Sequence, residues 1–209
     1  SAKSYLKLLQ GQINRYTQTH GRVLQSVAES SYDAWIKLYR ADENTGNAGI
    51  SYYNKGALVA LCLDLTLMQQ SAGKYRLFDV VKAFYQLAKE QGESGNRIRI
   101  GMDNDNLESV ISQFMDKAIW QDFKAKYVDG VEELPIYELL EANGIKITED
   151  SKDNTQAWGM SFSESSEGLQ VTKVLRDSVA SEAGISAKDV IVAIDGIKAT
   201  KKQLQSVAE

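Results

Sequence analysis

The chain has 209 residues and an ordinary globular composition, with 43% apolar and 25% charged residues, which excludes a chain that is disordered throughout. The formal net charge of −4 argues against nucleic acid as a partner, because nucleic-acid-binding surfaces concentrate basic residues. One cysteine, Cys62, and one histidine, His20, exclude an internal disulfide and the usual zinc motifs. The sequence contains no apolar stretch long enough for a membrane span and no signal peptide, and it leaves the localisation open.

Helical periodicity dominates the chain up to about residue 150. The pattern predicts a helix at the N-terminus, a short helix at 31–38, a nearly all-apolar buried helix at 56–68, an amphipathic helix at 77–89, and short helices at 120–123 and 136–142. Polar residues predict loops at 40–50 and 92–101. Asp64 is the one charge inside the apolar helix, and the sequence leaves open whether it is paired or lies at the edge of the helix.

Two helix ends carry local signals. Asp105 and Glu108 have the spacing of a capping box and predict a helix that starts after Asp105. The Asp-rich stretch 103–106 also has some likeness to a calcium loop, but it lacks the glycine and the closing glutamate of that motif. Asn143-Gly144 predicts the end of the helix at 136–142.

After Gly144 the pattern changes to short alternating runs divided by glycines. Residues 148–156 are polar and are interpreted as a linker, so we place a boundary between a helical region, 1–150, and a small mixed domain, 155–209. Predicted strands lie at 158–162, 169–175 and 190–194, and a helix at 202–207. The fold class is therefore α+β.

The small domain resembles a bacterial-type PDZ domain. The resemblance rests on Trp158-Gly159-Met160, on Ser178-Val-Ala-x-x-Ala-Gly-Ile185 and on Asp189-Val-Ile-x-Ala-Ile-Asp-Gly196. PDZ domains bind an extended peptide as an added strand and hold its C-terminal carboxylate with backbone N–H groups. The resemblance implies a peptide site in which Gly159 lets the backbone approach the carboxylate. Apolar contacts would come from the rest of the set: Trp158, Met160, Phe162 and Leu204, with Val207 on the same helix.

The resemblance has one departure, because the family continues beyond Glu209 to one more strand. The domain is therefore expected to be incomplete at its C-terminus. The alternative is a small α+β domain that shares these glycines without binding peptides.

The helical region is similar to the glycyl aminopeptidase family, in which a thermolysin-like zinc catalytic domain precedes a PDZ domain. The similarity lies in Tyr53-Asn54-Lys55-Gly56, in the longer stretches 25–40 and 51–67, and in 133–137. Met68 is a local departure, since relatives often carry arginine there. The larger departure is the zinc motif H-E-x-x-H with its third glutamate, which this chain does not contain. The chain is therefore expected to be a C-terminal fragment of such an enzyme and inactive alone.

The resemblance implies a role for Tyr53, whose hydroxyl would donate a hydrogen bond to the oxyanion of the tetrahedral intermediate. Tyr52 is the rival, but the family spacing selects Tyr53; a packed tyrosine with a satisfied hydroxyl is the alternative for either. Three aromatic residues, Tyr32, Trp35 and Tyr39, could line a substrate cleft, although we expect them to pack in the core.

These residues and resemblances lead to three alternative functions. The first is a fragment of a zinc aminopeptidase that prefers N-terminal Gly or Ala, with zinc and the upstream catalytic part as its partners. The second is a non-catalytic module that binds a peptide or protein C-terminus, and the third is a peptidase with another mechanism, for which no residue set is present. His20 is expected to be a solvent-facing or capping residue and Cys62 an inert buried one. An exposed apolar surface is expected where the upstream part would pack, and it could cause self-association.

Overall fold

The computed structural model describes residues 1–93, 104–148 and 158–207, and it has an α+β fold. The helical region and the C-terminal domain each have a hydrophobic cluster of their own. The first cluster takes its residues from 9–147 and the second from 158–204. The predicted boundary at 150–155 and most of the predicted linker lie outside the described residues, so the boundary stays a prediction.

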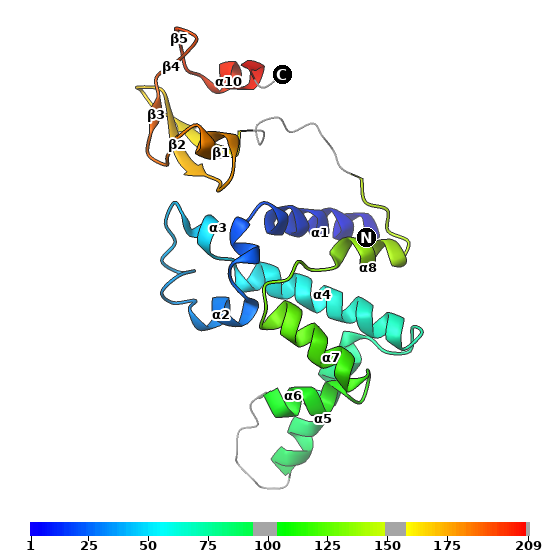
Figure 1. Ribbon diagram of the computed structural model, residues 1–209. Helices are drawn as coiled ribbons and strands as arrows, with labels where there is room; N and C mark the ends of the chain where they lie inside the picture. Colours follow the sequence, from blue (N-terminus) through cyan, green and yellow to red (C-terminus); the bar gives the residue numbers. More distant parts are fainter. Residues whose placement is uncertain (94–103, 149–157, 208–209) are drawn as a thin grey trace.

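The helical region is built around helix α4, Tyr52–Gln70, which Figure 1 shows running through its middle. Other helices surround it: α1 (Ala2–Thr17), η1 (His20–Val23), α2 (Val27–Tyr32), α3 (Thr45–Ala48), α5 (Leu77–Glu93), α6 (Asn104–Ile111), α7 (Lys117–Phe123), the π-helical turn η2 (Lys124–Val128) and α8 (Ile136–Ala142). Helix α4 packs against α1, α2, α5, α8 and η2. This explains why its residues are apolar nearly all round, as the predicted buried helix at 56–68 requires.

Two predicted helix starts are wrong. The helix predicted at 31–38 is α2, which begins at Val27 because Ser26 and Glu29 form a capping box. It ends at Tyr32, and consecutive turns follow up to residue 40. Helix α6 begins at Asn104, so Asp105 lies inside its first turn and is not a capping residue. The predicted loop at 92–101 lies largely outside the described residues.

Asp64 is paired, which answers the question that the sequence left open. Its carboxylate accepts hydrogen bonds from Arg76 Nε at 3.0 Å and from the backbone N–H of Leu77 at 2.8 Å. The Arg76 hydrogen bond is the main reason why the pKa of Asp64 lies below its usual value. The pair therefore joins the middle of α4 to the start of α5.

The C-terminal domain contains a three-stranded sheet with the order β1-β2-β3, and all its neighbours are antiparallel. Its strands are β1 (Met160–Glu164), β2 (Leu169–Val174) and β3 (Val190–Ile191). A hairpin of β4 (Ala193–Ile194) and β5 (Ile197–Lys198) follows, and Asp195 and Gly196 turn it with positive φ. The helices are α9 (Val179–Glu182) and α10 (Lys201–Val207). Strand β1 is an edge strand, because within the described residues only β2 pairs with it.

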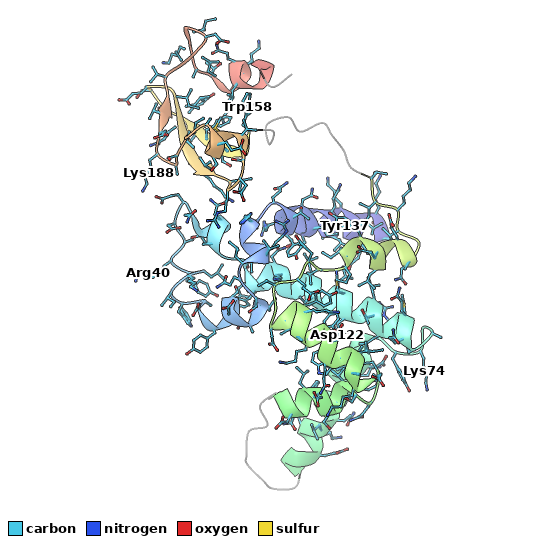
Figure 2. The ribbon with its side chains drawn as sticks, viewed as in Figure 1. Arg40, Lys74, Asp122, Tyr137, Trp158 and Lys188 are labelled. Carbon is cyan, nitrogen blue, oxygen red and sulfur yellow. The ribbon has the colours of Figure 1, made fainter. Side chains whose placement is uncertain are left out.

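The C-terminal domain contacts the helical region through α3 and the loop before it. The Asn47 side chain donates to the carbonyl of Val174 at 2.7 Å and accepts from the N–H of Arg176 at 3.0 Å. Lys188 forms an ion pair with Glu43 at 2.6 Å, and Figure 2 shows Lys188 at the end of the domain that faces the helical region. A cavity of about 580 Å³ lies between the two parts. None of the described helices is long and apolar enough to span a membrane.

Candidate functional site

Tyr53 lies in the first turn of α4, and its side chain is 62% exposed. Its hydroxyl lies 3.0 Å from the hydroxyl of Tyr39, which also lies 3.4 Å from the hydroxyl of Tyr52. The rings of Tyr52 and Tyr53 stack with their centroids 4.2 Å apart. The ring of Trp35 packs against the ring of Tyr39, with centroids 5.0 Å apart. We call these four residues the aromatic cluster.

The residues that follow Tyr53 anchor the start of α4 in the protein. The Lys55 side chain is fully buried, and its ammonium donates to the carbonyls of Arg22 at 2.8 Å and Gln25 at 3.3 Å. Burial lowers the pKa of Lys55. Asn54 is also buried and donates to the backbone carbonyl of Gln12 at 3.1 Å. The Tyr-x-Lys pattern therefore joins α4 to α1 and η1 while Tyr53 itself faces outward.

The hydrogen bonds of the aromatic cluster shift the pKa values of Tyr52 and Tyr53 in opposite directions. The hydrogen bond with the Tyr39 hydroxyl holds the pKa of Tyr53 below its usual value, because a hydrogen bond accepted by the Tyr53 oxygen favours the ionised form. The hydrogen bond to Tyr39 instead raises the pKa of Tyr52. Tyr53 is therefore the more acidic of the two and the better hydrogen-bond donor.

The expectation that Tyr32, Trp35 and Tyr39 pack in the core is wrong. Their side chains are 90%, 79% and 52% exposed. The reason is that α2 ends at Tyr32, so residues 33–40 do not continue its helical face, and Ala34 is the residue of this segment that turns into the protein. These exposed aromatic side chains belong to a segment whose Tyr39 contacts Tyr53.

The residues predicted for peptide binding lie together in the C-terminal domain. Met160 and Leu204 are buried in its core, and Trp158 and Phe162 are half-buried against the same cluster. Of the side chains at 205–207, including Val207, nothing is described. Gly159 has a positive φ of 66°. A Cβ at Gly159 would lie 2.1 Å from that of Ser178, so this close approach within the domain also requires glycine.

Comparisons with known proteins bear on both parts of the chain. The sequence model of M61 glycyl aminopeptidase matches residues 1–59, which include the whole aromatic cluster, and that of the PDZ domain matches residues 141–209. The first part of the helical region is therefore similar to M61 glycyl aminopeptidases. The C-terminal domain of the chain is a PDZ domain, as the sequence predicted.

A solved structure is similar to the chain over its whole length. It is the crystal structure of an aminopeptidase N family protein from Idiomarina loihiensis, with 33% sequence identity and a TM-score of 0.84. The match covers 100% of this chain and 36% of that protein, so the chain spans about a third of the length of this relative. No curated protein matches the chain significantly.

The described residues of the chain do not fit a zinc centre. They bring together no group of three or more His, Cys, Asp or Glu side chains that could hold a metal ion. Cys62 is fully buried in the core of α4, and burial raises the pKa of its thiol to about 12, so it is neither a ready ligand nor a ready nucleophile. The reaction proposed for Tyr53 therefore does not use a metal held by these residues.

Sequence reasoning singled out Tyr53 as a candidate and expected Tyr39 in the core, but it indicated neither the contact between their hydroxyls nor the burial of Lys55. The sequence shows an aromatic residue at position 39, but it does not show that the hydroxyl of Tyr39 meets the hydroxyl of Tyr53, 14 positions along the chain. That contact depends on how the turns at 33–40 fold back toward α4. The signal that could have indicated Lys55 is its place beside the apolar run 57–63, where a charged residue needs a buried partner.

Proposed function

We propose that this chain is part of a zinc aminopeptidase that removes N-terminal Gly or Ala, and that Tyr53 donates a hydrogen bond to the oxyanion formed during hydrolysis. The observation that carries this proposal is the exposed Tyr53 side chain at the start of a mostly buried helix. The match of residues 1–59 to the M61 glycyl aminopeptidase model and the similar solved structure support the peptidase class. The Gly or Ala preference and the zinc rest on the family resemblance.

The chemistry of Tyr53 follows from amide hydrolysis. Attack of water on the scissile carbonyl places negative charge on the carbonyl oxygen, and a fixed O–H donor aimed at that oxygen stabilises the transition state more than the substrate. The lowered pKa of Tyr53 strengthens this donor. Buried Lys55 and Asn54 hold the helix start, so the donor does not need to be repositioned during the reaction.

The proposal assigns the metal ligands and the general base to a part of the protein outside these residues. The exposed side chains of Tyr53 and Trp35 lie where that part would pack. Within this chain, Tyr53 contributes the donor and the aromatic cluster surrounds it.

The test is Tyr53→Phe in the full-length protein, measured as hydrolysis of glycyl and alanyl p-nitroanilides with zinc present. Loss of one oxyanion donor lowers kcat by about 10²–10³-fold and leaves KM nearly unchanged. Tyr32→Phe is the matched control, because it removes another exposed hydroxyl from the same surface. Full activity of Tyr53→Phe, or turnover by the 209-residue chain alone with added zinc, contradicts the proposal.

A second function is supported by the free edge of β1. We propose that the PDZ domain binds the C-terminal end of a peptide or protein as a strand added to β1, since within the described residues this strand pairs only with β2. The test is titration of the chain with pools of short fluorescent peptides that carry either a free C-terminal carboxylate or an amide. Binding that requires the free carboxylate supports the proposal, and equal binding of both forms, or none, contradicts it.

A further inference from the structure

The Tyr39 hydroxyl lies within hydrogen-bond distance of two other hydroxyls, at 3.0 Å from Tyr53 and 3.4 Å from Tyr52. All three side chains are wholly or partly exposed, so burial does not force this arrangement on them. Water could satisfy each hydroxyl separately. The shorter of the two contacts lies within the distance range of an O–H···O hydrogen bond, and it joins Tyr39 to the residue to which the proposed function gives the reactive hydroxyl.

Tyr39 is held independently of α4. Its backbone N–H donates to the carbonyl of Ala34 at 2.9 Å, and Ala34 is buried. The ring of Trp35 packs against the ring of Tyr39, and an ion pair between Asp33 and Lys37 at 2.5 Å closes the preceding turn. Contacts within the segment 33–40 therefore hold the Tyr39 hydroxyl in position.

We propose that Tyr39 is a positioning residue for Tyr53: its hydroxyl donates to the Tyr53 oxygen, orients the Tyr53 O–H toward the substrate and increases its strength as a donor. The inference rests on the proposed function of Tyr53 and deepens it. A hydroxyl has one proton to donate and two lone pairs, so Tyr53 can accept from Tyr39 and still donate to an oxyanion. Tyr39 itself does not touch the reacting atoms in this arrangement.

The direction of the pH effect follows from the same geometry. Among the described residues, the groups that act on the Tyr53 hydroxyl are the hydroxyls of Tyr39 and Tyr52, with Tyr39 the stronger. Both lower the pKa of Tyr53. Removal of the Tyr39 hydroxyl therefore moves the pKa of Tyr53 upward, toward its ordinary value.

The first measurement is made on the 209-residue chain with tyrosine labelled with carbon-13 at the ring carbon that carries the hydroxyl. Tyr53→Phe assigns the Tyr53 resonance, and its alkaline titration is followed by NMR in the wild type and in Tyr39→Phe. We expect the Tyr53 titration to shift to higher pH in Tyr39→Phe. Tyr32→Phe, which removes an exposed hydroxyl from the neighbouring segment, is the control and leaves the Tyr53 titration unchanged.

The second measurement uses the full-length protein with glycyl p-nitroanilide across a range of pH. We expect Tyr39→Phe to lower kcat at neutral pH by about 2- to 12-fold, the effect of one hydrogen bond, and to move the alkaline limb of the profile to higher pH. KM and the thermal unfolding midpoint stay close to those of Tyr32→Phe. A residue that only supports the fold would change stability without moving the alkaline limb.

The outcomes separate the two proposals. If Tyr53→Phe retains full activity, the proposed function of Tyr53 fails and the role of Tyr39 fails with it. If Tyr53→Phe loses activity but Tyr39→Phe changes neither the titration of Tyr53 nor the pH profile, the role of Tyr53 stands and the inference about Tyr39 is wrong. A shift of both readouts in Tyr39→Phe supports the inference.

Discussion

Replacement of the buried Lys55 by methionine tests how the Tyr53 helix is anchored. Lys55→Met keeps most of the side-chain volume but removes both hydrogen bonds of the ammonium. The carbonyls of Arg22 and Gln25 then lose a donor, and an unpaired buried carbonyl costs about 1–3 kcal/mol. Methionine also avoids the cost of burying a cation, which offsets part of this loss. We therefore expect the free energy of unfolding to fall by about 2–4 kcal/mol.

The assay is urea unfolding followed by far-ultraviolet circular dichroism, with thermal unfolding as a second measure. For a chain of this length the expected loss corresponds to a fall of about 5–15 °C in Tm. Lys7→Met is the matched control because Lys7 is exposed on α1, where such a change costs less than about 0.5 kcal/mol. Equal stability of Lys55→Met and Lys7→Met would refute the reasoning, since the two carbonyls would then not depend on the ammonium.

Two further predictions concern stability. Arg76 lowers the pKa of Asp64 in the folded state, so this group stabilises the protein above its ordinary pKa of 3.8 and loses that contribution as the pH falls through the lower folded value. The urea midpoint of the wild type should therefore approach that of Asp64→Asn on acidification, and a gap that is constant with pH would contradict this. Gly21→Ala should cost about 1–3 kcal/mol, because its Cβ would lie 2.0 Å from the carbonyl oxygen of Gly49. Gly56→Ala is the control and should be neutral or stabilising by up to about 1 kcal/mol in the same urea assay, since its Cβ would make only an ordinary contact and α4 gains a better helix former. Equal losses of stability in both variants would argue against the clash between residue 21 and Gly49.

The contact between the two parts of the chain lies close in sequence to the catalytic candidate. Asn47 bonds the PDZ domain from α3, and the chain then passes through Ile50 and Ser51 into α4. The backbone N–H of Ile50 donates to the buried Gln25 side chain at 3.0 Å. The loop that holds the PDZ domain is thus also tied to the segment whose carbonyls bind Lys55.

Local signals predicted much of the secondary structure. The apolar run 56–68 lies within α4, and the helix predicted at 136–142 has these bounds as α8. These features depend on periodicity and helix ends, which act over a few positions. The α2 start was missed although the Ser26–Glu29 capping box is also local.

The sequence by itself determined the α+β class, because hydrophobic periodicity is a property of neighbouring residues. The PDZ domain and Tyr53 as the candidate donor were predicted from the resemblance of local motifs to known families. Only the tertiary structure decided that the aromatic residues of 32–39 face outward, that Lys55 binds two carbonyls and that Tyr39 reaches Tyr53. These facts depend on where a segment turns and which distant backbone it meets. An aromatic side chain has the same local preferences in a core and beside a reactive hydroxyl, so its role is set by contacts far along the chain.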